Sequence, residues 1–227
     1  MILGFDSAGK SVSAAVYDEN NNICLASRFL KGAGTHSVTL LPIIDEVLSE
    51  AGVKTDGLSA IAVTVGPGSF TGVRIGVSLA KGLAISKNIP VIPVSAMEAS
   101  AFAALSEAKE GDVILSVSDA RRERFYNAAF SVKEGKLCRI TEDSVLHYTQ
   151  ICELVYQNRI IIAGDGAELF ASLVNDNRFL ISATPYTSGE SVCLAARNKE
   201  KICSDNLLPV YLGLSQAERE LNEKSAK

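Results

Sequence analysis

Short apolar segments separated by turns make up the first half of the chain. Residues 2–6 predict a strand, alternation over 12–17 predicts a second, and 23–29 predict a third after an asparagine turn at 20–22. A helix follows from Thr35 or Ser37 to about Ala51, with Gly52 as its stop. Two further strand–helix pairs are predicted at 61–65 with 71–87 and at 90–94 with 95–108. The hairpins and alternating elements predict an α/β lobe.

The second half of the chain repeats this plan. Strands are predicted at 113–118, 125–131 and 160–163, a hairpin turn at 133–136, and helices at 167–174 and about 190–201. A strand ends at Asp6 in the first half and at Asp119 in the second, and each half has a glycine turn, at 66–68 and 164–166. A βββαβα unit used twice predicts the actin-like ATPase fold, also called ASKHA or RNase H-like. We assign 1–108 to an N-terminal lobe and 109–227 to a C-terminal lobe and tail, with a helix at about 190–204 that packs back on the first lobe.

Composition and charge narrow the classes of function. Apolar residues make up 47% and charged residues 21%, the formal net charge is −4, and the pI is about 5.3. Without a basic excess, strong nucleic-acid binding by the chain alone is not expected. Five cysteines without a C-x-x-C pair, and two histidines, predict reduced thiols and no transition-metal site. Asp6 comes too early for a signal peptide, and no run of about 18 successive apolar residues could span a membrane. We therefore expect a cytoplasmic protein.

Residues 4–11 match the P-loop pattern G-x-x-x-x-G-K-[ST] in full. A P-loop must lead into a helix, because the free amides of the helix N-terminus hold the phosphates. Here Ser11 begins an alternating segment with β-branched Val12 and Val16, which predicts a strand. Asp6 would also repel an anion. We therefore reject nucleotide hydrolysis by a P-loop.

The segment 66–76, Gly-Pro-Gly-Ser-Phe-Thr-Gly-Val-Arg-Ile-Gly, joins a predicted strand to a predicted helix. Two interpretations stay open for its glycines: an anion site at the helix N-terminus assisted by Arg74, or simply a tight turn. Within the helix, Gly72, Gly76, Ala80 and Ala84 recur every four residues and form a stripe of small side chains. The stripe either packs against the lobe's own sheet or receives a partner.

The first predicted helix carries a wide apolar arc. Its apolar residues are Leu40, Leu41, Ile43, Ile44, Val47, Leu48 and Ala51. The arc is wider than one core-facing stripe requires, which indicates a second burial event against another chain. The first two helices together are therefore a candidate docking surface.

These residues resemble the TsaB (YeaZ) family of tRNA threonylcarbamoyladenosine biosynthesis. The segment 66–76 carries most of the resemblance, with support from 36–42, 90–95, 119–121, 164–166 and 209–212. The resemblance implies an actin-like subunit without catalytic activity. It would pair with a TsaD-type paralogue and a TsaE-type ATPase to form N6-threonylcarbamoyladenosine beside the anticodon. It also implies that the first two helices form the heterodimer interface.

The predicted functional residues fall into two sets. The partner interface is expected to contain His36, Leu40, Leu41, Ile44, Val47, Leu48, Phe70, Thr71, Gly72, Val73, Gly76 and Ala80. Candidate nucleotide-binding residues are Asp6, Gly68, Ser69, Arg74 and Asp119. No catalytic residue, metal ligand or cofactor of its own is expected, with ATP and Mg²⁺ placed only at the complex interface. The chain alone is expected to form a homodimer and to meet tRNA through the complex.

Alternatives follow from the same residues. Asp6 and Asp119 are expected to face each other across the cleft. They are either carboxylates that cap turns, which we favour, or remnants of a site that held a metal ion and phosphate. A basic turn contains Arg121, Arg122 and Arg124. We interpret it as the solvated end of a hairpin, and contact with tRNA phosphate is the alternative. The competing function is a stand-alone actin-fold ATPase or phosphotransferase, which would need a phosphate-binding turn and a base.

Overall fold

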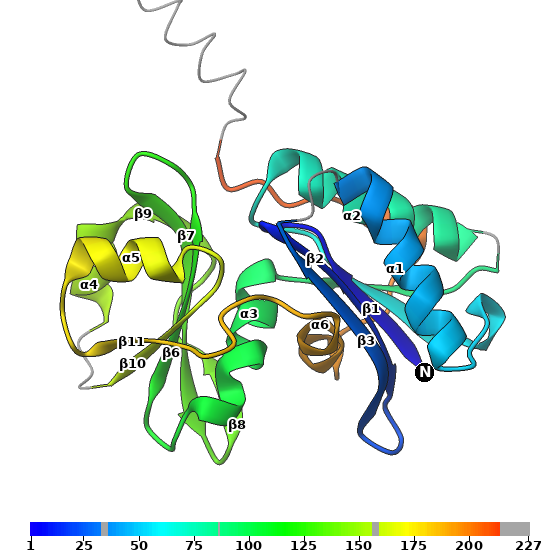
Figure 1. The fold of residues 1–227 in the computed structure, drawn as a ribbon, viewed down its shortest axis with the longest axis horizontal. Helices are drawn as coiled ribbons and strands as arrows, with labels where there is room; N and C mark the ends of the chain where they lie inside the picture. The colour runs from blue at the N-terminus through cyan, green and yellow to red at the C-terminus, as the bar shows by residue number, and fades with distance from the viewer. Residues whose placement is uncertain (33–35, 86, 156–158, 214–227) are drawn as a thin grey trace, which may run out of the picture.

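The computed structural model describes residues 1–32, 36–85, 87–155 and 159–213. It contains two sheets, one in each half of the chain (Figure 1). The first has the order β3-β2-β1-β4-β5 and is built from β1 (Ile2–Asp6), β2 (Ser11–Asp18), β3 (Ile23–Lys31), β4 (Ala60–Thr64) and β5 (Val91–Val94). The second has the order β11-β10-β6-β7-β8 and is built from β6 (Val113–Asp119), β7 (Arg124–Lys133), β8 (Lys136–Arg139), β10 (Ile160–Ala163) and β11 (Phe179–Ile181), with β9 (Ser144–His147) paired to β7.

The two sheets have the same topology. In each, the first strand pairs antiparallel with the second and parallel with a later strand, β4 or β10, and the last strand, β5 or β11, continues the parallel edge. The predicted duplicated actin-like fold is confirmed. Since Ser11 begins β2 and pairs with Lys31, the P-loop pattern leads into a strand, and the rejection of that motif is also confirmed.

The helices lie on both faces of the sheets. They are α1 (His36–Glu50), α2 (Phe70–Ile85), α3 (Ala96–Ala104), α4 (Tyr148–Leu154), α5 (Ala167–Val174) and α6 (Gly189–Ala196), with short 3₁₀ turns at Thr55–Gly57, Leu105–Glu107 and Ser204–Asn206. Gly52 ends α1 at a φ of 65°, and the hydroxyl of Ser95 accepts from the amides of Met97 and Glu98 to begin α3, as predicted. Among the described residues, no helix is long and apolar enough to span a bilayer.

Two helices connect the lobes. α3 comes from the first half of the chain but packs on the second sheet, against β6, β7 and β10, whereas α6 comes from the second half and packs on β1 and β2. Figure 1 shows these two helices side by side between the lobes. A Cβ at Gly189 would overlap the Ala14 backbone, so the first turn of α6 lies directly on β2.

This exchange explains why the first sheet is covered on both faces. The alternation of apolar and polar residues in β2 predicts a strand with one exposed face, yet all eight of its residues are buried. α1 and α2 cover one face of the sheet, and α6 covers the other. The second face is covered by residues almost 180 positions away, which local periodicity does not reveal.

Candidate functional site

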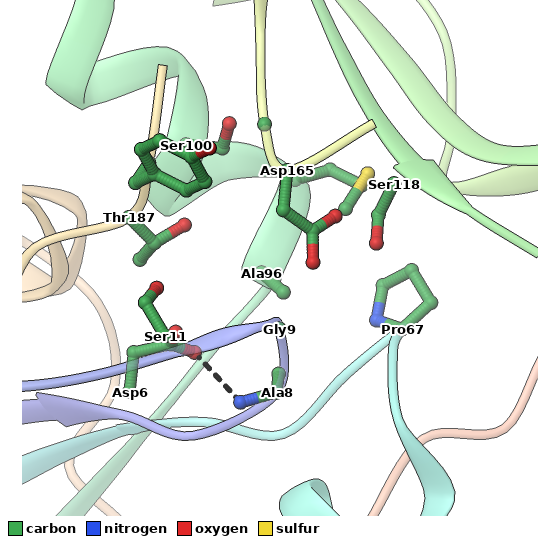
Figure 2. Close-up of a pocket in the computed structure, with 13 residues that line it drawn as sticks. Asp6, Ala8, Gly9, Ser11, Pro67, Ala96, Ser100, Ser118, Asp165 and Thr187 are labelled. Atoms are coloured by element: carbon green, nitrogen blue, oxygen red, sulfur yellow. Dashed lines mark hydrogen bonds between the residues drawn. The ribbon is translucent and has the colours of Figure 1, made fainter. Parts of the chain in front are cut away.

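The end of β1 places Asp6 in the space between the lobes. Asp6 is 2% exposed, and its Oδ1 accepts hydrogen bonds from the Thr64 hydroxyl at 2.5 Å and the Ala8 amide at 3.1 Å. Figure 2 marks the bond to Ala8. Thr64 lies at the end of β4, so two neighbouring parallel strands hold the carboxylate.

Burial raises the pKa of Asp6 to about 6, because water is excluded from its charged form. The bonds from Thr64 and Ala8 lower the pKa, and the nearby Asp165 carboxylate raises it. Asp6 is therefore a carboxyl group that gains a proton in mildly acidic solution.

The second lobe provides Asp165, in the glycine turn between β10 and α5. Its Oδ2 accepts from the Lys10 amide at 2.9 Å, and the Lys10 Nζ donates to the Asp165 carbonyl at 3.4 Å. Asp165 Oδ1 is buried and has no hydrogen bond to any described residue. The amides of Ala8 and Lys10 in the β1–β2 turn are thus both bonded to the chain's own carboxylates.

A small cavity remains between these groups. Its volume is about 20 Å³, and its lining includes Asp6, Ser100, Ser118, Asp165 and Thr187, which Figure 2 shows around it. Ser100 is 1% exposed, and its hydroxyl has no partner among the described residues. A volume of this size holds about one water molecule. The cleft is therefore narrow beside Asp6.

The glycines of segment 66–76 bring α2 onto the β1–β2 turn. A Cβ at Gly68 would overlap the Ala8 carbonyl, and a Cβ at Gly72 would overlap the Ser7 carbonyl. The Ser7 hydroxyl donates to the Gly72 carbonyl at 2.8 Å, and the Ser69 amide donates to the Ala8 carbonyl at 2.7 Å. The start of α2 and the β1–β2 turn therefore pack closely and are bonded to each other.

Comparison with known proteins identifies this architecture. A family model described as TsaD, tRNA N6-adenosine threonylcarbamoyltransferase, matches residues 31–205. The tRNA threonylcarbamoyladenosine biosynthesis protein TsaB of Bacillus subtilis is 31% identical over 96% of this chain and 96% of its own length. The chain belongs to the TsaB family. It functions in the biosynthesis of threonylcarbamoyladenosine in tRNA.

Two further relatives agree with this. YeaZ from Pseudomonas aeruginosa superimposes with a TM-score of 0.77 and 27% identity, covering 93% of this chain and 99% of its own. A Phocaeicola vulgatus protein named tRNA N6-adenosine threonylcarbamoyltransferase is 34% identical over 49% of this chain and 37% of its own length. The chain is thus similar both to TsaB proteins over its whole length and to a named transferase over half of it.

The predicted interface residues of this TsaB-family chain divide by exposure into a buried set and a set that reaches the surface. Their buried members already pack inside the first lobe and offer no surface: Leu40, Ile44, Val47, Leu48, Gly72, Val73, Gly76 and Ala80. Leu41 and Thr71 are exposed, and Phe70 is half-buried. The wide apolar arc of α1 is filled mainly by the lobe's own sheet and α2, because both flank the helix. His36 is half-buried, with its Nε2 3.0 Å from the Gly9 carbonyl oxygen.

Of the predicted nucleotide-binding residues, Asp6, Gly68 and Ser69 meet at the β1–β2 turn, whereas Arg74 and Asp119 lie apart from them. Arg74 lies on the exposed side of α2, with its guanidinium 3.8 Å from the Phe70 ring centroid and its Nε donating to the Tyr211 hydroxyl at 2.9 Å. Asp119 accepts from the Arg121 amide at 2.7 Å and does not line the cavity; Ser118 and Asp165 face Asp6 there instead. Within the described ranges, no group of three His, Cys, Asp or Glu residues could hold a metal ion.

Sequence reasoning missed two features of the site. The first is Asp165, which the sequence indicates only as part of a turn. This turn occupies the same place in the second lobe as Gly66–Gly68 in the first, and that correspondence indicates a position at the cleft. The second is the segment that ends the described chain: the Val210 amide donates to the Val65 carbonyl at 2.7 Å, and Tyr211 packs on Phe70 with ring centroids 4.6 Å apart. No local pattern indicated where this segment would pack.

Proposed function

We propose that this chain is a non-catalytic subunit that binds a TsaD-type transferase and supports its formation of N6-threonylcarbamoyladenosine in tRNA. Two bonded amides in the β1–β2 turn carry the proposal. A phosphotransferase of this fold needs amides that are open to phosphate, whereas the Ala8 and Lys10 amides are bonded to Asp6 and Asp165. The cavity beside Asp6 is also small, about 20 Å³, and we therefore assign the chemistry to the partner subunit.

The outer face of α1 and α2 is the proposed docking surface. The two helices lie side by side (Figure 1). Val38 is 69% and Leu41 43% exposed on α1, and Ile85 is exposed at the end of α2. Each of these apolar side chains keeps a large exposed fraction among the described residues, and contact with a second chain would remove it from water.

Gly82 supports the same surface. It is exposed in the last turn of α2, and a Cβ there would meet no tertiary neighbour within 4 Å among the described residues. Glycine costs a helix about 1 kcal/mol relative to alanine, and the chain's own packing gives no reason for it here. Close approach of a partner helix would be such a reason.

The rest of the assembly follows from this proposal. We assign a TsaE-type ATPase as a further partner, a homodimer to the chain alone, and a cytoplasmic site of action. ATP and Mg²⁺ would bind between subunits rather than inside this chain, in keeping with its narrow cleft.

The docking surface can be tested by substituting two leucines whose side chains are almost equally exposed. Leu41→Glu on α1 should weaken co-purification with the TsaD-type partner about 30-fold or more, because it buries a charge at the interface. Leu169→Glu on α5, at 41% exposure, is the matched control and should leave partner binding unchanged. Full binding by Leu41→Glu would exclude this surface.

The competing function has its own measurement. Calorimetry of the purified chain with ATP and Mg²⁺ should give no heat of binding. Micromolar affinity with turnover would instead support a stand-alone ATPase or phosphotransferase.

A further inference from the structure

The turn between β6 and β7 has an unusual backbone. Three successive residues adopt left-handed conformations: Arg121 at φ 67°, Arg122 at φ 54° and Glu123 at φ 57°. This region suits glycine, asparagine and aspartate, and none of the three residues belongs to that group. Backbone strain of this kind is concentrated at functional sites, so the turn needs an explanation beyond joining two strands.

The surrounding structure holds the turn in this conformation. The Arg121 amide donates to Asp119 Oδ1 at 2.7 Å, and the Arg124 amide donates to the Arg121 carbonyl at 3.2 Å. The Glu123 carbonyl accepts from the amide that begins α4, that of Tyr148, at 3.1 Å. The turn is therefore a fixed element of the second lobe that presents its side chains in set directions.

Those side chains are mainly basic. Arg121, Arg122 and Arg124 are all exposed, in a chain whose formal net charge is −4. Arg124 uses one nitrogen to donate to the Val145 carbonyl at 3.1 Å, and Glu123 lies 3.2 Å from the His147 Nε2. Arg121 and Arg122 also make interactions within the chain. Since a guanidinium carries five donors, such a contact does not exhaust its capacity.

The turn lies beside the cleft. A Cβ at Gly166 would come within 3.0 Å of the Asp119 amide, so the glycine turn of Asp165 packs directly on the start of the β6–β7 turn. Asp165 in turn binds Lys10, which is exposed in the corresponding turn of the first lobe. The equivalent turns of both lobes thus carry cations at one end of the cleft. Figure 1 places this end of β7, next to β9, opposite the end that pairs with β8.

From this we infer that Arg121 and Arg122 bind the phosphate backbone of tRNA. The inference rests on the proposed function, because tRNA is the substrate of that complex. The planar guanidinium matches phosphate with paired hydrogen bonds, and phosphate contacts position a nucleic acid without reading its sequence.

The test removes the two charges without disturbing the turn. Arg121→Asn with Arg122→Asn introduces a residue type that tolerates left-handed backbone. Lys133→Thr with Lys136→Thr is the control: it removes the same charge from the exposed hairpin at the other end of β7. Both variants are assembled with the TsaD-type partner, and binding of an unmodified tRNA transcript is measured by fluorescence anisotropy from 50 to 300 mM KCl.

We expect the arginine variant to bind tRNA about tenfold more weakly at low salt. The slope of log K against log salt should fall by about 0.9 for each lost phosphate contact. The lysine control should match the unsubstituted complex. The melting temperature of the arginine variant should stay the same or rise by a few degrees, because asparagine relieves the backbone.

Four results would overturn the inference. They are an unchanged slope in the arginine variant, an equal loss in the lysine control, a wild-type complex that does not bind the transcript, and a variant that loses the TsaD-type partner instead of tRNA. The last would make the turn a protein contact. Failure of the proposed function is distinguishable from these, because the unsubstituted chain would then fail to assemble with the partner before any tRNA is added.

Discussion

The two lobes share one strand order but differ in the helices on their outer faces. The first lobe carries α1 and α2, of 15 and 16 residues, whereas the second carries α4 and α5, of 7 and 8. Both pairs leave apolar side chains exposed, and the second lobe in addition presents a strained arginine turn. A duplicated scaffold can therefore keep its sheets and differ in the surfaces placed on them.

The lobes are nevertheless one packed unit. One hydrophobic cluster contains Leu3 of β1, Met97 and Ala101 of α3, and Ile114 and Phe130 of the second sheet. Because α3 and α6 each pack on the sheet of the opposite half, the lobes differ in surface but should not differ in stability. The predictions below test both sides of this comparison.

The largest effect is expected from Phe170→Ala in α5. Phe170 is fully buried, with edge contacts to Phe125 at 5.2 Å and Phe179 at 5.6 Å between ring centroids. The cavity should cost about 3–5 kcal/mol in the free energy of unfolding, measured by urea denaturation. Hydrogen exchange should rise in both lobes, since α3 and α6 couple them. Two separate unfolding transitions, or a change confined to the second lobe, would show independent lobes.

A second test compares two glycines of α2. Gly72→Ala should lose about 3 kcal/mol of stability or more, because the new Cβ overlaps the Ser7 carbonyl. Gly82→Ala, the same substitution in open space, should gain about 1 kcal/mol. Gly82→Ala should nevertheless weaken the TsaD-type partner's binding if this face docks. Equal stability changes at the two sites would contradict the packing described here.

The third test concerns Asp6, which ends the first strand of the first lobe. Its folded-state pKa of about 6 lies above the ordinary 3.8, so the folded chain binds the proton more tightly between these pH values. The resulting stability is fully present below about pH 4 and is lost as the pH rises to about 6, by up to about 3 kcal/mol. Asp6→Asn should remove this slope in denaturation curves from pH 4 to 7. Parallel curves for the two proteins would argue against a buried, protonatable Asp6.

Much of the fold could be read locally. The strand at 160–163 and the helix at 167–174 have the predicted bounds, and Gly52 ends α1 where expected, because caps, turns and periodicity act over a few residues. Three short elements were missed: β9, α4 and β11. The last predicted helix ends at Ala196 rather than about 201. The tail after Leu214 and the Thr35 cap lie outside the described residues.

The sequence by itself determined the duplicated strand plan, the failure of the P-loop pattern and the family, because each depends on neighbouring residues or on a contiguous motif. Only the tertiary structure decided which face of each helix is buried, since the exchange of α3 and α6 covers surfaces from distant parts of the chain. It also decided the cleft, where Asp165 reaches across 155 positions to the Lys10 amide. The Asp165 carboxylate can accept from the Lys10 amide only when the two lobes are packed together. Local sequence patterns do not encode that packing.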